Sequence, residues 1–159
     1  MSIPDDTEIL AQLDRLPEAI ADDLETEHLE FKPWADAKAA LQSMAANDPA
    51  LECVQLTYVN PETGEDAENV LGFYALMLRP GQSLKLPARS PACVFHQIEG
   101  RAQLQIDDQN FTLDSADTCC APGFTGVSLR NLSATEPAFL FMADESPLHR
   151  KLGVYEVRG

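Results

Sequence analysis

Residues 81–100 read GQSLKLPARSPACVFHQIEG, and residues 116–131 read ADTCCAPGFTGVSLRN. Within the first stretch, the run 92–98 is rich in aromatic and β-branched residues and lies between two turn signals, Pro80-Gly81 and Glu99-Gly100. Eight short runs of this kind occur after residue 50 without a helical stripe between them, which predicts an all-β sandwich or barrel. The predicted strands are 53–59, 70–78, 92–98, 102–106, 111–113, 118–121, 125–129 and 138–142.

The first part of the chain has helical periodicity instead. Apolar residues recur at helical spacing from Ile9 to Leu24, and Pro17 suits the first turn of a second helix. An alanine-rich stretch at 36–46 predicts a further helix that ends before Pro49. We therefore expect a helical segment at 1–49 that packs on a single β-barrel at 50–159.

Length and composition limit the classes of function. The 159 residues, 45% of them hydrophobic, suffice for one domain with its own core. The formal net charge of −15 repels phosphate backbones and anionic lipids, so we expect neither nucleic acid nor a membrane as a partner. Residues 1–6 lack the features of a secretory signal, and no apolar run approaches the ~18 residues of a spanning helix. We expect a cytoplasmic protein whose four cysteines are free thiols.

The stretch 81–100 resembles the first of two signature motifs of the cupin superfamily. That motif runs Gly, five residues, His-x-His, three or four residues, Glu, six residues, Gly. In this chain the same spacing falls on Gly81, Pro87, Arg89, Cys93 and Gly100. Both glycines are kept, but the histidine and glutamate positions carry other residues.

The stretch 116–131 resembles the second cupin motif, which runs Gly, five residues, Pro-x-Gly, two residues, His, three residues, Asn. The corresponding residues here are Ala116, Pro122, Phe124, Val127 and Asn131. The proline and the asparagine are kept. Together the two motifs imply a single jelly-roll cupin β-barrel with an N-terminal helical appendage.

The resemblance places the metal-ligand positions of the cupins at Pro87, Arg89, Cys93 and Val127. A non-haem iron site needs imidazole or carboxylate donors that converge on one point. Proline and valine have no side-chain donor, arginine is a permanent cation, and one cysteine alone does not make a site. We therefore expect no metal cofactor, and iron only if the chain is an active oxygenase.

The histidines do not replace these ligands. His28 lies in the predicted helical segment, and His149 lies near the C-terminus. His96 lies on the predicted strand 92–98, where side-chain alternation sends it to the face opposite Cys93. We interpret His96 as a core or interface histidine with a satisfied hydrogen bond.

Several segments resemble the C-terminal cupin half of gentisate 1,2-dioxygenases and of their salicylate and 1-hydroxy-2-naphthoate relatives. They are FKPW at 31–34, LTYVNPETG at 56–64, VFHQIEGR at 94–101, FMADESP at 141–147 and LGVY at 152–155. These dioxygenases are bicupins, which hold iron with histidines of the N-terminal barrel and split the ring of a hydroxylated aromatic acid. The resemblance implies the fold of the other barrel, which contributes packing and subunit contacts.

Three functions are compatible with this pattern. The first is a non-catalytic cupin that lacks metal ligands and either binds a small, possibly aromatic, carboxylate or serves as an oligomeric module. Its pocket would be lined by Arg89, Cys93, Phe95, Gln97 and Val127, although Arg89 could instead pair with an acid at the rim. The second is a gentisate-type ring-cleaving oxygenase, alone or with a separate catalytic barrel, and the third is a structural dimer partner without a pocket. We expect a homodimer, because exposed sheet edges favour pairing.

Overall fold

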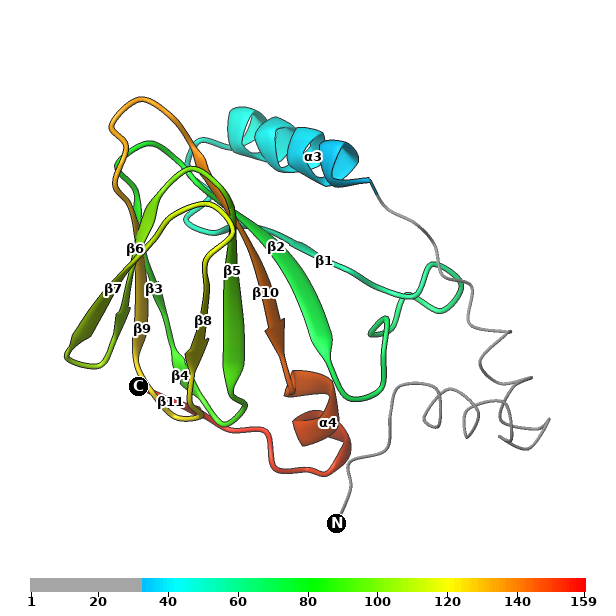
Figure 1. The fold of residues 1–159 in the computed structure, drawn as a ribbon. Helices are drawn as coiled ribbons and strands as arrows, with labels where there is room; N and C mark the ends of the chain where they lie inside the picture. The colour runs from blue at the N-terminus through cyan, green and yellow to red at the C-terminus, as the bar shows by residue number, and fades with distance from the viewer. Residues whose placement is uncertain (1–32) are drawn as a thin grey trace, which may run out of the picture. The chain divides into compact units, whose positions relative to one another are not determined.

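Two antiparallel β-sheets share one core in residues 33–159, the part of the chain that the computed structural model describes (Figure 1). The five-stranded sheet has the order β1 (Val54–Thr57), β2 (Gly72–Leu78), β10 (Ala138–Asp144), β5 (Cys93–Glu99) and β8 (Thr118–Ala121). The four-stranded sheet has the order β3 (Ser83–Leu86), β9 (Val127–Asn131), β6 (Ala102–Ile106) and β7 (Gln109–Leu113). A short pair, β4 (Ala88–Arg89) with β11 (Val157–Arg158), completes the strands of the described residues.

The main core lies between the two larger sheets and follows strand alternation. On β2, for example, Tyr74, Leu76 and Leu78 point into this core, while Ala75 and Met77 point to the other face. The β-rich fold predicted from the sequence is therefore confirmed. The buried residues of the main core are Tyr74, Leu76, Leu78, Cys93, Phe95, Ala102, Leu104, Leu113, Ala121, Val127, Leu129, Ala138, Leu140 and Met142.

Each of the eight predicted strands is present, with ends that differ by a few residues. Strands β3, β4 and β11 were not predicted. Strand β3 does carry a signal, because Leu84 and Leu86 pack against the core while Ser83 and Lys85, which alternate with them, are exposed. Strands β4 and β11 have two residues each, too few for any periodicity to appear in the sequence.

The predicted helix at 36–46 is α3 (Trp34–Asn47), which covers part of the outer face of the five-stranded sheet. Its residue Leu41 is fully buried in a second core with Met77 and Phe139. The carboxylate of Glu99, at the end of β5, accepts hydrogen bonds from Trp34 Nε1 at 2.7 Å and from Lys38 Nζ at 2.5 Å. The other predicted helices and His28 lie outside the described residues.

A second helix, α4 (Ser146–Lys151), follows β10 and precedes the C-terminal strand. Neither α3 nor α4, the helices of the described residues, is long and apolar enough to cross a membrane.

The backbone supports the motif alignment. Gly81 and Gly100 have φ angles of 68° and 81°, the left-handed region that glycine adopts at little cost. The two positions where the second cupin motif has glycine, Ala116 and Phe124, also have positive φ, 75° and 60°. Asn131 is buried, and its side-chain amide donates to the carbonyl groups of three other residues. The turn geometry of the motifs is therefore present although two of the glycines have been replaced.

Candidate functional site

The four positions where cupin metal ligands were expected lie around one small cavity. Pro87, Arg89, Cys93 and Val127 all line it, together with Phe95. The cavity has a volume of about 20 Å³, which is room for about one water molecule. An aromatic acid would enter only if the side chains around the cavity moved apart.

The side chain of Arg89 forms an ion pair inside the protein. Its Nη1 lies 3.0 Å from Oδ2 of Asp144, whose side chain is completely buried, whereas the Arg89 side chain keeps 20% exposure. Asp144 is the last residue of β10 and is the pairing partner of Cys93 across the β10–β5 ladder. One of our expectations was that Arg89 pairs with an acid at the rim. Its partner is instead the buried Asp144.

Asp144 also contacts two neutral donors. Its Oδ1 accepts a hydrogen bond from the backbone N–H of Ser146 at 3.0 Å and from the hydroxyl of Tyr74 at 3.3 Å. Its Oδ2 has the ion-pair contact with Arg89 but no aligned hydrogen bond. The attraction between Arg89 and Asp144 is thus mainly electrostatic, and the carboxylate is held in place by groups around its other oxygen.

Burial and the Asp144 charge shape the acidity of the neighbouring groups. Burial works against the charged form of Arg89, but Asp144 and the hydroxyl of Tyr155 outweigh it and raise the pKa of Arg89 above its ordinary value. Burial, reinforced by Asp144, raises the pKa of Cys93 to about 12. At neutral pH the site therefore contains a guanidinium cation, which Asp144 can balance, and a protonated thiol.

The residues present do not fit an iron site. Pro87 and Val127 have no donor atom, and Cys93 is protonated. The carboxylate of Asp144 is already paired with Arg89. Among residues 33–159, no group of three or more His, Cys, Asp or Glu side chains is arranged to hold a metal ion. We therefore derive no chemistry from a metal at this position.

The remaining predicted pocket residue, Gln97, is not at the cavity. It is fully buried, and its amide donates to the carbonyl oxygen of Glu99 at 2.8 Å and to that of Phe139 at 3.4 Å. The second bond lies where the β5–β10 register shifts, between Phe139 and Leu140. Gln97 thus satisfies backbone groups at an irregularity of the sheet.

His96 lies on the face opposite Cys93, as strand alternation predicts. Its Nδ1 lies 2.9 Å from Oγ1 of Thr118 on the neighbouring strand β8, so the predicted hydrogen bond is present. His149, on α4, contacts the hydroxyl of Ser90 at 2.9 Å.

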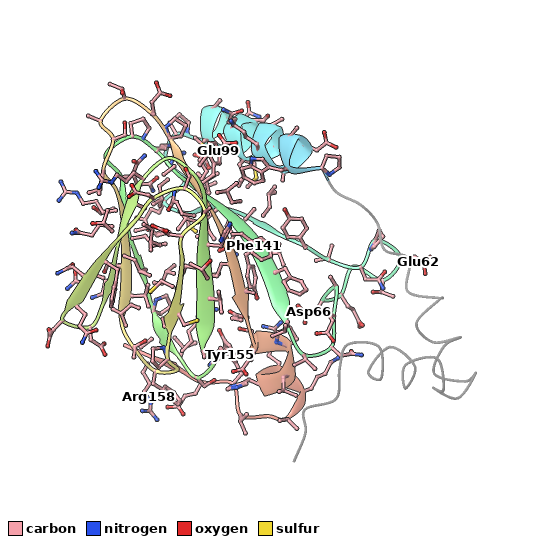
Figure 2. The ribbon with its side chains drawn as sticks, in the orientation of Figure 1. Glu62, Asp66, Glu99, Phe141, Tyr155 and Arg158 are labelled. Carbon is pink, nitrogen blue, oxygen red and sulfur yellow. The ribbon has the colours of Figure 1, made fainter. Side chains whose placement is uncertain are left out.

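The backbone of Arg89 is fixed from two sides. Val157 of β11 pairs with it in the ladder, and Phe124 donates its N–H to the Arg89 carbonyl oxygen at 2.6 Å. The ring of Phe124 in turn lies 3.9 Å from the guanidinium of Arg158. In Figure 2, Tyr155 and Arg158 lie at the end of the sheets opposite Glu99 and α3. The C-terminal segment therefore lies at the end of the two sheets that carries Arg89, since β11 pairs with β4 there.

Asp144 is the residue of this site that the motifs did not indicate. It lies beyond both motifs in the chain, so no spacing pointed to it. A signal was nevertheless available, because Ala138, Leu140, Met142 and Asp144 share the inward face of β10 by alternation. An acidic residue that continues an apolar face needs a cationic partner.

Known proteins resemble this chain over most of its length. No family model matches the chain. A gentisate 1,2-dioxygenase from a Ralstonia species is 71% identical over 127 residues, which are 80% of this chain and 36% of that protein. The chain is similar to one part of a gentisate 1,2-dioxygenase. A 1-hydroxy-2-naphthoate 1,2-dioxygenase from a Nocardioides species is 27% identical over 124 residues, 77% of this chain and 32% of that protein.

Solved structures agree on the fold of this gentisate-dioxygenase-like chain. A salicylate 1,2-dioxygenase from Pseudaminobacter salicylatoxidans matches with a TM-score of 0.72 and 20% identity, over 80% of this chain and 38% of that one. The cupin domain of Schizosaccharomyces pombe Cnp3 matches with a TM-score of 0.51 and 12% identity, over 67% of this chain and 72% of that one. The chain thus has a cupin-like fold and spans about a third of the length of the dioxygenases that it resembles.

Proposed function

We propose that this chain is the metal-free cupin unit of a gentisate-type ring-cleaving dioxygenase, and that a second barrel, the companion barrel, supplies the iron. The similarity to one part of a gentisate 1,2-dioxygenase, at 71% identity, supports a place in this kind of enzyme. The observation that carries the metal-free part is the ion pair of Asp144 with Arg89, because Arg89 occupies one of the positions where the cupin motifs have a metal ligand. Gentisate or a related hydroxylated aromatic acid would react at the companion barrel.

The proposal also includes the architecture and the assembly of the unit. The two sheets form a closed jelly-roll barrel that corresponds to the C-terminal half of the relatives. The unit works through packing and subunit contacts, in a homodimeric and cytoplasmic assembly. The ion pair of Arg89 with Asp144 suits a structural role, because the two buried charges balance each other without a bound ligand.

A chimera tests the companion arrangement. The segment of the Ralstonia enzyme that matches this chain is replaced by the corresponding residues of this chain, and the unaltered enzyme is carried through the same procedure. We expect the chimera to hold iron and to consume oxygen with gentisate at a rate within about tenfold of the parent enzyme. A folded, iron-loaded chimera that does not turn over gentisate would contradict the proposal.

The chain by itself tests the metal-free part. After incubation with Fe²⁺ and removal of unbound metal, we expect the purified chain to hold far less than one iron per chain and to leave gentisate intact. Stoichiometric iron together with ring cleavage would overturn the proposal in favour of an oxygenase that works alone.

A second candidate function is the binding of a small carboxylate by Arg89. The observation in its favour is that the Arg89 side chain is 20% exposed beside the cavity, so an anion could reach it from outside. Such a ligand would have to compete with Asp144 and enlarge a cavity of about 20 Å³. Thermal-shift measurements with benzoate, salicylate and gentisate test this, because a ligand of the native state raises the melting temperature. A shift that is lost in Arg89→Met supports the candidate, and a shift that persists in this variant does not.

A further inference from the structure

We infer that the guanidinium of Arg89 is a resident cation that keeps this site free of metal, and that Asp144 and Cys93 beside it are a latent pair of metal donors. The inference rests on the metal-free part of the proposed function. The inference gives a cause for the absence of metal and names the two side chains, Asp144 and Cys93, that a divalent metal would use.

The two donors face the same space. Asp144 and Cys93 are directly opposite each other across the β10–β5 ladder, and both side chains are directed into the core between the sheets. Residues paired in this way have Cβ atoms about 4.5–5.5 Å apart. Carboxylate and thiolate groups are both ligands of Zn²⁺ and of similar divalent ions. Their separation suits two ligands of one ion.

The charge of Asp144 requires a cation. Its side chain is completely buried, and an isolated carboxylate in such a place would be strongly disfavoured. Arg89 supplies the positive charge at 3.0 Å, and a divalent metal would supply it in the same place. The guanidinium and a metal ion therefore exclude each other, both by charge and by the space that they occupy.

Asp144 and Cys93 have no third metal donor beside them among residues 33–159. Histidine at position 89 would remove the fixed charge and introduce an imidazole that can bind a metal when neutral. The backbone at this position is held by the pairing with Val157 and by the N–H of Phe124, so it does not depend on the arginine side chain. The variant Arg89→His would thus place an imidazole beside the carboxylate of Asp144 and the thiol of Cys93.

The test is a Co²⁺ titration of the chain, prepared without a histidine tag and followed by visible absorption. We expect Arg89→His to bind one Co²⁺ at least about 100-fold more tightly than the unaltered chain, with the absorption of a cobalt–thiolate bond. Adding Asp144→Asn or Cys93→Ser to Arg89→His should abolish the tight binding, and Cys93→Ser should also abolish the thiolate absorption. Arg89→Lys, which keeps the charge, should resemble the unaltered chain.

Three results would overturn the inference. They are tight Co²⁺ binding by the unaltered chain, equal binding by Arg89→Lys and Arg89→His, and binding by Arg89→His that survives Asp144→Asn. If Arg89→His folds only with metal, recovery of its β-sheet circular dichroism on refolding with Co²⁺ supports the inference, and failure to recover counts against it. No gentisate is present in these measurements, so their outcome is separate from that of the chimera.

Discussion

Arg89 and Asp144 join two separate sheets through a single ion pair. Nη1 of Arg89, on the short strand β4, lies 3.0 Å from Oδ2 of Asp144, at the end of β10 in the five-stranded sheet. Because Asp144 is completely buried and Arg89 mostly so, water screens this pair little. Loss of one partner of this pair should therefore cost more stability than loss of one partner of a surface ion pair.

Arg89→Met should destabilise the protein strongly. It would leave the Asp144 carboxylate buried without its cation, and breaking a buried pair in this way costs roughly 3–5 kcal/mol. Asp144→Asn should also destabilise, whereas the double variant should lose clearly less than the sum of the two, since neither partner is then left alone. The free energy of unfolding, measured by urea denaturation, gives all three values.

A matched control comes from Arg101, which pairs with Asp114 at 2.8 Å on the surface, where the two side chains are 60% and 66% exposed. Because solvent screens that pair, Arg101→Met should change the free energy of unfolding by no more than about 0.5 kcal/mol. Equal losses in Arg89→Met and Arg101→Met would show that burial gives the inner pair no special weight.

Glu99 should make the attachment of α3 dependent on pH. Hydrogen bonds from Lys38 and Trp34 hold the pKa of Glu99 below its ordinary value of about 4.3. A carboxyl whose pKa is lowered by folding contributes stability above its unfolded pKa and loses that contribution as the pH falls through its folded pKa. The unaltered chain should therefore be more stable than Glu99→Gln at pH 7, and this advantage should shrink below about pH 4.3.

The fluorescence of Trp34, the single tryptophan of the chain, reports on the same contact. Glu99→Gln should alter its emission near neutral pH, because a neutral amide replaces the carboxylate that accepts from the indole N–H. Glu136→Gln, at an exposed loop position, is the control and should change neither the emission nor the pH profile. A constant stability difference between pH 7 and pH 3 would argue against the Glu99 contact.

The sequence predicted the β-rich fold of residues 33–159 because strand alternation and turn residues are local signals. The motif spacing was informative as well, because the four positions that it named, Pro87, Arg89, Cys93 and Val127, all line one cavity. Three of them lie on different strands, and Pro87 lies in the connection between β3 and β4. The spacing could not indicate the partner of Arg89, because an ion pair depends on how distant strands pair. The register of β10 against β5, which sets Asp144 beside Cys93, becomes visible only in the folded chain.

Gln97 shows the other limit of sequence reasoning. Alternation correctly sends it inward with Cys93 and Phe95, but direction alone does not decide whether a residue reaches a cavity. The register shift next to Phe139 leaves a carbonyl oxygen that the Gln97 amide approaches, and the sequence carries no sign of that irregularity. A pocket list based on alternation therefore includes residues that serve the backbone.

The cysteines should differ sharply in reactivity. The thiol of Cys93 is buried and its pKa is raised to about 12, so it is protonated even at pH 9, whereas Cys120 is exposed. Labelling of the native chain with a thiol-reactive disulfide at pH 8 should give a fast phase that Cys120→Ser removes and Cys93→Ser leaves intact. Cys93 should react only when the chain is unfolded. Fast labelling of Cys93 in the native state would mean that the cavity opens readily.

Ala116→Gly should stabilise the protein. Ala116 has a φ of 75°, which costs an alanine roughly 1–2 kcal/mol but costs glycine little. Glycine also makes the unfolded chain more flexible, which offsets part of the gain, so we expect about 0.5–1 kcal/mol in the free energy of unfolding. The backbone N–H of residue 116 would keep its bond to the Gln97 carbonyl oxygen, at 2.8 Å in the present chain.

Ala134→Gly is the matched control, because Ala134 is exposed and its φ is not positive, so this change should be neutral or destabilising. If both variants destabilise equally, the turn at Ala116 does not carry the strain that its backbone angle indicates.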